Sequence, residues 1–307
     1  MNSGEQFAFL TANEAGVKPV QLLHGYSTEV TARDQRSLGL APDLLRAGTE
    51  VFVAAVPNDK IGDVIAACAR LRRNGLTPVP HIVARNFANA GALDEFVGRL
   101  VDEAGMDRCL VLGGDRDNPA GNYDSSLQLL ETGIIQKRGV TALYIGCYPE
   151  GHPKIGDATL TSALAAKIAL AEREALAVTL VSQFCFDAAP IIAFAKRIRR
   201  DGISVPFRVG VAGPADRGLL LKYALICGVG NSLRVLRNRS ALAKNALSGE
   251  TPEVIISSLE AAQTIDPSLG LSGFHFFTFG SLAKTVQWAD RRKRVNTNAA
   301  QDSIGDR

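Results

Sequence analysis

Polar residues that could do acid–base chemistry follow short apolar runs at several points of the chain. The clearest case lies between Arg108 and Pro119, where the apolar run 109–112 ends at two glycines and then Asp115. An apolar run of this length, bounded by turn residues, is typical of a buried strand. The glycines allow a tight turn and the close approach of a flat ligand. Because ligands of α/β proteins bind at the carboxyl ends of strands, Asp115 is a candidate catalytic or binding residue.

Other apolar runs also stop at polar side chains, which indicates a ring of strand ends around one mouth. Carboxylates and imidazoles there can move protons, and phenol and amide groups can bind a ligand by hydrogen bonds. These further candidates are Glu29, His81, Tyr148, Glu150, His152, Gln183 and His275. Each also has a structural interpretation: Asp115 could cap a turn, and His275 between two phenylalanines could belong to the core. No metal site is expected, because no pair has metal-ligand spacing, and the chain has no GxSxG motif.

The elements that must hold these side chains alternate between strand-like and helix-like patterns. Runs rich in apolar and β-branched residues predict eight strands. They cover residues 19–30, 50–56, 77–83, 109–112, 140–148, 177–186, 207–211 and 273–279. Apolar residues at helical spacing predict helices between these strands. The helices cover residues 43–46, 61–73, 93–104, 125–137, 161–175, 190–200, 219–227, 251–264 and 281–294.

Strands that alternate with helices, without a break in composition, predict an α/β fold with a single (β/α)8 TIM barrel. We expect one barrel domain over residues 1–294, with a short N-terminal arm. A polar tail over residues 295–307 need not be ordered. A doubly wound open sheet is the alternative. It is disfavoured because no GxGxxG motif follows the first strand and no GxxxxGK(S/T) loop occurs.

Composition excludes several classes of protein. The 307 residues are 46% hydrophobic and 21% charged, as in globular proteins, and no apolar run is long enough for a membrane span. The net charge is only +3 and most basic residues are scattered, so no nucleic-acid partner is expected. The five cysteines lie far apart without a CxxC pair. We therefore expect a reduced cytoplasmic protein with neither disulfides nor a zinc site.

In their order along the chain, these motifs resemble the methylenetetrahydrofolate reductase family, the folate-reducing flavoproteins of one-carbon metabolism. The resemblance extends from about Tyr26 to about Trp288 and places each motif at its own strand end. The motifs are Ser27-Thr28-Glu29-Val30, Pro80-His81-Ile82, Gly114-Asp115, Tyr148-Pro149-Glu150-Gly151-His152-Pro153, Ser182-Gln183-Phe184-Cys185-Phe186-Asp187 and His275-Phe276-Phe277-Thr278. The most specific pair is YPExHP followed by QFxFD.

This resemblance implies a role for each matching residue. Glu29 is implied as the general acid that supplies a proton as the five-membered ring of 5,10-methylenetetrahydrofolate opens to an iminium. A hydride from reduced FAD then reaches that carbon, with NAD(P)H as a possible electron donor. Asp115, the second implied catalytic residue, lies between flavin and folate. The residues implied to bind tetrahydrofolate are Asp115, Gln183 and Tyr223, and those implied to bind FAD are His81, Gly114, Asp115, Tyr148, His152 and Lys167.

Parts of the flavin site depart from the family pattern. The family usually has Arg-Gly-Asp where this chain has Gly113-Gly114-Asp115, and Ala54-Ala55 stands where the family has a threonine. The helix that binds the flavin phosphates reads LTSALAAKIALAERE here, and of its polar positions only Lys167 matches. These departures predict weak FAD binding and altered recognition of NAD(P)H.

Two classes of function remain open from the sequence. One is a folate oxidoreductase, with a variant that uses NAD(P)H directly without a flavin. The other is a pterin- or folate-binding barrel without redox chemistry, which binds folate or transfers a methyl group. Glu29 favours catalysis, because a passive binder needs no proton donor, whereas the departures in the flavin site favour the second class. The physiological direction, the electron partner and the oligomeric state stay open, with a homo-oligomer among the alternatives.

Overall fold

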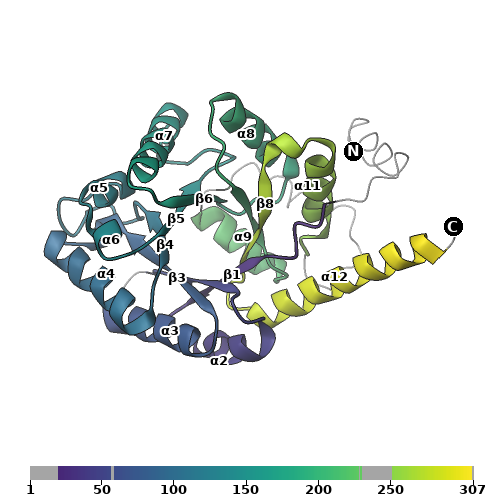
Figure 1. Cartoon of the computed structure of the whole chain (residues 1–307), viewed down its shortest axis with the longest axis horizontal. Helices are drawn as coiled ribbons and strands as arrows, with labels where there is room; N and C mark the ends of the chain where they lie inside the picture. Colours follow the sequence, from purple (N-terminus) through teal and green to yellow (C-terminus); the bar gives the residue numbers. More distant parts are fainter. Residues whose placement is uncertain (1–19, 57–58, 228, 230–250, 306–307) are drawn as a thin grey trace.

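Eight parallel strands close into a barrel in the order in which they occur along the chain (Figure 1). The computed structural model describes residues 20–56, 59–227, 229 and 251–305. Each strand pairs with the next one, and β8 pairs with β1. The strands are β1 (Ser27–Thr31), β2 (Glu50–Ala54), β3 (Thr77–Val83), β4 (Arg108–Leu112), β5 (Ala142–Cys147), β6 (Ala177–Ser182), β7 (Phe207–Ala212) and β8 (Leu271–Phe277). The predicted (β/α)8 barrel is confirmed.

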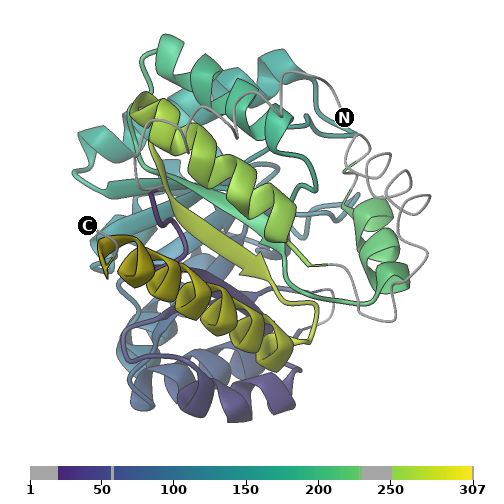
Figure 2. The same ribbon diagram turned by 90° about the vertical axis from the view of Figure 1, so that its right-hand side faces the viewer.

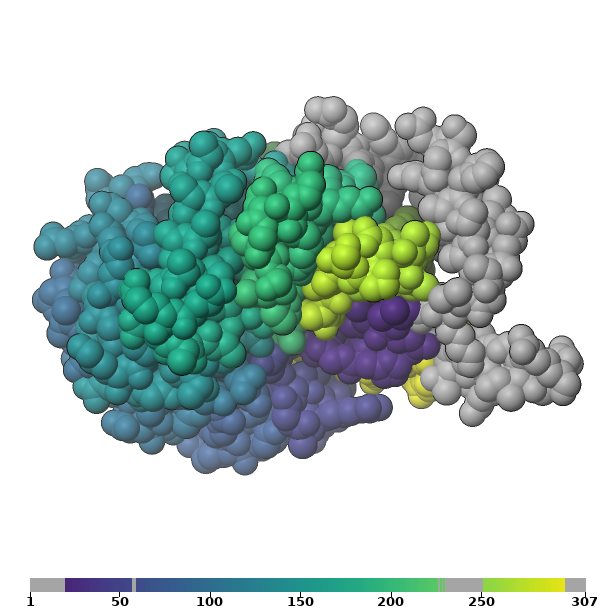
Figure 3. All heavy atoms as spheres, turned by 45° about the horizontal axis from the view of Figure 1, so that its top comes forward, coloured from purple at the N-terminus to yellow at the C-terminus, as the bar shows by residue number. Residues whose placement is uncertain are grey.

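Helices follow the strands and form the outer layer of the barrel. They are α2 (Gln35–Leu44), α3 (Ile61–Arg73), α4 (Ala90–Ala104), α5 (Ser126–Glu131), α6 (Ile134–Lys137), α7 (Asp157–Arg173), α8 (Ala188–Arg200), α9 (Arg217–Ile226), α11 (Glu253–Ile265) and α12 (Leu282–Gly305). Two short 3-10 helices are η1 (Ala84–Asn86) and η2 (Pro267–Leu269). In Figure 3 the start of the described chain, in purple, lies beside the yellow-green segment that includes α11, where the Val20 amide donates to Oγ1 of Thr264.

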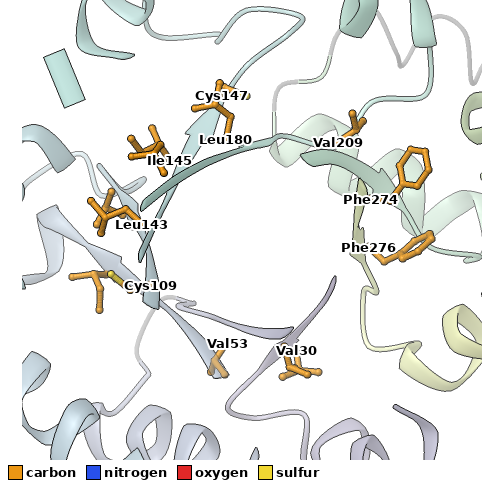
Figure 4. Packing of buried hydrophobic residues seen from close by; sticks show 14 of the residues in the cluster. Val30, Val53, Cys109, Leu143, Ile145, Cys147, Leu180, Val209, Phe274 and Phe276 are labelled. Carbon is orange, nitrogen blue, oxygen red and sulfur yellow. The ribbon is translucent and has the colours of Figure 1, made fainter. Parts of the chain in front are cut away.

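The strands are buried on both faces, which explains why they appear in the sequence as nearly continuous apolar runs. Side chains alternate between the outer helices and the interior. In β2, Val51 and Val53 belong to the outer core, and Phe52 lies in a separate interior cluster. Figure 4 looks into the ring of strands, where labelled side chains such as Val53 and Ile145 point away from its centre. The other buried members of the interior cluster are Val79, Leu110, Tyr144 and Val181.

A charged cluster closes the amino-terminal end of the barrel, and we call it the floor. Glu50 accepts a hydrogen bond of 2.7 Å from Nη1 of Arg108 and further bonds from Tyr144 and Arg208. Burial raises the pKa of Glu50, but Arg208, Tyr144 and Arg108 lower it more, so the net pKa lies below the ordinary value. The Arg208 guanidinium also lies 5.5 Å from the centroid of the Tyr144 ring. The side chains that fill the floor are thus ion-paired.

Several element boundaries differ from the prediction. The first strand begins at Ser27, because residues 22–25 form a turn, so the predicted start at residue 19 is wrong. Helix α2 is ten residues long, although only 43–46 was expected. Asp34 caps it by accepting a hydrogen bond of 3.0 Å from the Ser37 amide, and the helix continues through Pro42, which reads as a breaker in the sequence.

Two helical segments also differ from expectation. The helix predicted over 125–137 is divided into α5 and α6, because Gly133 between them adopts a left-handed conformation with φ +72°. The last helix, predicted to end at residue 294, extends to Gly305. Figure 1 shows the end of α12 extending away from the barrel.

Helix α12 is fastened to α11 near the point where it leaves the barrel. Arg292 of α12 lies 3.2 Å from the buried Glu260 carboxylate of α11. Figure 2 shows the two helices on either side of β8. Within the described ranges, no helix is both long and apolar enough to cross a membrane.

Candidate functional site

Three side chains meet at the carboxyl-terminal end of the barrel, which we call the mouth. Glu29 comes from β1, His81 from β3 and His275 from β8. The Glu29 carboxylate lies 3.6 Å from Nε2 of His81 and 3.8 Å from Nε2 of His275. Both imidazoles are buried, whereas the side chain of Glu29 is 20% exposed. The mouth therefore presents one carboxylate backed by two imidazoles.

Both imidazoles are neutral near pH 7. Burial lowers the pKa of His81 to about 4, against an opposing effect of Glu29. Burial also lowers the pKa of His275, and Glu29 again opposes it. Nε2 of His81 is buried and has no hydrogen-bond partner in the structure. This atom is thus a buried polar atom beside Glu29 whose hydrogen bond is not made within the described part of the protein.

The ring of His275 is fixed on several sides. Its Nδ1 lies 2.9 Å from Oγ of Ser27, and both residues are fully buried. The ring centroid is 4.3 Å from that of Phe52 and 5.0 Å from that of Phe277. When the Ser27 hydroxyl donates to Nδ1, the neutral imidazole carries its proton on Nε2 and directs it to Glu29. The sequence indicates His275 as a candidate site residue, but it does not predict the contact of His275 with Ser27.

A second group of predicted residues lies on the rim formed by the loops after β4 and β5. Gly114 has φ +105°, and a Cβ at this position would lie 2.5 Å from a methyl group of Val83, so only glycine fits. Asp115 follows it and is exposed. The rings of Tyr148 and His152 are edge to face, 5.0 Å apart. Burial, together with the charge of Asp115, raises the pKa of Tyr148 to about 12. Burial lowers the pKa of His152, and the charge of Asp115 opposes this effect.

Aromatic side chains line the mouth on the side of β6 to β8. Tyr223 is a predicted folate contact. Its ring stacks on that of Phe279, with 4.6 Å between the ring centroids, so Phe279 covers one face of the Tyr223 ring. Gln183 uses its side-chain oxygen to accept a bond of 3.0 Å from the Phe184 amide, so its amide N–H groups are its donors for a ligand. The residues packed in this aromatic cluster include Phe184, Phe186, Tyr223, Phe277 and Phe279.

Cys227, which the sequence did not indicate as a site residue, ends α9 and is partly buried. Burial, together with the charges of Asp115 and Glu29, raises the pKa of its thiol to about 11. The thiol is thus within electrostatic reach of both carboxylates. No local pattern in the sequence signals this position, because Cys227 enters the site only through the placement of α9.

Lys167 lies apart from the other predicted residues. Its ammonium group is 3.4 Å from Oγ of Ser126, at the start of α5, and burial lowers its pKa. Its side chain lines a pocket between α7 and α8, together with Leu164 and Phe194. Tyr148 also lines this pocket, so the pocket reaches the rim.

The structure therefore brings most of the predicted site residues together. Glu29 and His81 form the centre, and Gly114, Asp115, Tyr148 and His152 form one rim. Gln183 lies beside this rim, since its main-chain amide donates to the carbonyl of Cys147, and Tyr223 lies on α9. No set of three or more His, Cys, Asp or Glu side chains in the described part of the chain is arranged to hold a metal ion. A scan against models of known protein families finds none that matches the chain.

Proposed function

We propose that this protein is a folate oxidoreductase that interconverts 5,10-methylenetetrahydrofolate and 5-methyltetrahydrofolate by hydride transfer through FAD. The observation that carries the proposal is the Glu29 carboxyl group, which stands at a strand end beside two buried, neutral imidazoles. Such a group can give a proton to a bound ligand and take it back. The free cysteines are consistent with a reducing compartment, and we propose a cytoplasmic location.

In this proposal Glu29 protonates the folate as its five-membered ring opens to an iminium. The carboxylate left behind is adjacent to Nε2 of His275, whose N–H stabilises the carboxylate charge without adding a positive charge to the site. Asp115 and the amide of Gln183 bind the polar edge of the pterin. Tyr223, supported from behind by Phe279, offers its free face to a flat ring. The buried aromatic wall keeps water away from the iminium.

The residues present fit a flavin better at its ring system than at its phosphates. FAD, when bound, supplies the hydride, and NAD(P)H is the proposed electron donor. The unpartnered Nε2 of His81 offers a hydrogen bond to a polar edge of the rings, and Gly114 lets a flat group approach its backbone. Tyr148 and His152 complete this side of the site. Lys167 is the cation that we propose binds the diphosphate of FAD. The apolar side chains beside Lys167 on α7 are consistent with weak FAD binding.

One observation favours a second candidate function. The inward positions of α7 near Lys167 carry Leu160, Leu164 and Ile168, which give a diphosphate nothing to bind. This favours a reductase that takes a hydride directly from NAD(P)H, or a folate-binding barrel without redox chemistry. In a direct NAD(P)H reductase, Glu29 would act as the general acid just as it does in the FAD-dependent reaction.

Anaerobic mixing of the purified, FAD-supplemented protein with 5-methyltetrahydrofolate tests the proposal. We expect the flavin absorbance to bleach, because the hydride passes from the methyl group to the flavin. Oxidation of NAD(P)H by methylenetetrahydrofolate without FAD would support the direct reductase. Saturable binding of folate without either reaction would overturn the redox proposal and leave a binding protein.

A further inference from the structure

The loop that carries Asp115 is wrapped around one residue, Arg85 of η1. The main-chain amide of Arg85 donates a bond of 3.0 Å to the carbonyl of Gly113, and its carbonyl accepts one of 2.9 Å from Ala120. The guanidinium group donates from Nη1 to the carbonyl of Arg116 at 2.7 Å and from Nε to the carbonyl of Asp124 at 3.2 Å. Arg85 thus contacts the loop near its beginning, middle and end.

These contacts lie on both sides of Asp115. The carbonyls of Gly113 and Arg116 come just before and just after it in the chain, and both accept bonds from Arg85. The ion pair of Asp117 with Lys154, at 3.1 Å, joins two side chains that are 86% and 72% exposed, so it holds the loop only weakly. Arg85 thus holds the backbone on both sides of Asp115, through its main-chain amide at Gly113 and through its guanidinium at Arg116.

Close backbone packing makes this arrangement specific. A Cβ on Gly121 would lie 1.9 Å from the carbonyl oxygen of Ala88, so the loop presses directly on the segment that follows η1. A Cβ on Gly114 would collide with Val83, at the end of β3. The loop is thus packed closely against residues 83–88 at these two glycines. A lysine at position 85 could not reproduce the contacts, because an ammonium group lacks the planar fork that reaches two carbonyls at once.

We propose that Arg85 is the positioning residue for Asp115, and that its guanidinium holds the backbone directly after Asp115, at the carbonyl of Arg116. Its role in folate chemistry rests on the proposed function, whereas its control of Asp115 does not. The charge of Asp115 opposes the lowering of the His152 pKa, so the titration of His152 reports where that charge lies. Lys154, the other charged residue that acts on His152, lies on the loop after β5 and is paired with Asp117 of the Asp115 loop, so Asp115→Asn, which leaves that pair intact, isolates the effect of the Asp115 charge.

NMR titration of the four histidines provides a test that needs no ligand. Asp115→Asn should lower the pKa of His152, and Arg85→Ala should lower it in the same direction and by no more. Arg85→Lys should give an intermediate value and serves as the reference if Arg85→Ala folds poorly. The control is Arg138→Ala, which breaks a half-exposed ion pair with Asp94 on the outer layer and should leave His152 unchanged. A wild-type His152 titration in Arg85→Ala or in Asp115→Asn would overturn the proposal.

The reaction with 5-methyltetrahydrofolate gives a second readout. Arg85→Ala should slow flavin bleaching by about 10- to 100-fold, the range expected when a binding group is misplaced by about 1 Å. In the Arg85→Ala/Asp115→Asn double variant the rate should equal that of Asp115→Asn alone, because Arg85 acts through Asp115. Additive losses would overturn the proposal. A wild-type protein that does not react with the folate removes the proposed function, while the titration still decides the role of Arg85.

Discussion

The Glu29 carboxylate and Nε2 of His81 face each other across 3.6 Å, and this nitrogen is buried without a hydrogen bond. Because burial lowers the pKa of His81 to about 4, the pair carries no imidazolium charge near neutral pH. A proton on Glu29 can therefore pass to a ligand without competition from a charged neighbour. The lowered pKa of His81 also makes the free energy of unfolding depend on pH.

Protein stability should fall as the pH drops below about 6.5. His81 has a folded pKa of about 4 and an unfolded pKa of about 6.5, so the unfolded chain binds more protons between these values. The contribution of His81 to the free energy of unfolding is complete above pH 6.5, and it decreases by about 3 kcal/mol as the pH approaches 4. Urea unfolding at pH 7.5 and pH 4.5 measures the loss. The loss should be smaller in His81→Gln, and an equal loss in the variant would show that other groups cause it.

Replacement of Glu29 by Gln should separate the two half-reactions. Glutamine keeps the shape of the side chain but has no proton to transfer, so the folate half-reaction should slow by about 10²–10⁴-fold. Flavin reduction by NAD(P)H needs no folate proton and should continue at the wild-type rate. Stopped-flow spectroscopy follows both steps. Equal slowing of both would indicate damage to the site, and a normal folate step would exclude Glu29 as the acid.

Replacement of Asp115 by Asn should raise the midpoint potential of a bound flavin. A negative charge near the rings disfavours the addition of electrons, so its removal makes reduction easier. Folate turnover should also decrease, because Asp115 is proposed to bind the pterin. Redox titration with a reference dye measures the potential. A potential equal to that of the wild type would place Asp115 away from the flavin and leave it a role on the rim alone.

Replacement of Lys167 by Ala should weaken FAD binding by about 1–3 kcal/mol, the usual loss for a charge-assisted hydrogen bond. Equilibrium titration followed by flavin fluorescence gives the dissociation constant. Lys196→Ala is the matched control, because Lys196 is exposed on α8. If both variants bind FAD as the wild type does, the diphosphate is held by other groups.

Replacement of Gly210 by Ala should destabilise the barrel by about 1–3 kcal/mol, as expected for overpacking. The added Cβ would lie 2.1 Å from the carbonyl oxygen of Ser182 and 2.9 Å from the ring of Phe277. Gly218→Ala in α9 is the control, since a Cβ there meets nothing within 4 Å. It should stabilise the protein by about 0.4–1 kcal/mol, because alanine restricts the unfolded chain. Urea denaturation compares the two, and equal stabilities would show that β7 adjusts freely.

The sequence predicts those parts of the fold in which local pattern and tertiary packing agree. Helix α3 and strand β3 have the predicted bounds, because α3 buries Val64, Ile65, Cys68 and Leu71 at helical spacing and β3 is a continuous buried run. Helix α2 is mostly missed because Pro42 reads as a helix breaker, although packing against α3 and α12 keeps the helix intact around it.

The parts of the site that escape prediction depend on contacts between distant residues. Ser27 and His275 are 248 positions apart and meet only because β1 and β8 close the barrel. The contacts of Arg85 with the Asp115 loop likewise need both segments in place. The strand ends could be identified from the sequence because a polar residue after an apolar run is a local signal, whereas a hydrogen bond across the barrel is not.

The ion-paired floor closes the amino-terminal end of the barrel. Glu50 and its partners occupy the end opposite Glu29, and the layer of Phe52, Val79, Leu110, Tyr144 and Val181 lies between them. Among the described residues, the floor and this layer lie beneath Glu29, so a ligand approaches Glu29 from the mouth. Two ligands that need the same face of this site therefore cannot occupy it at the same time.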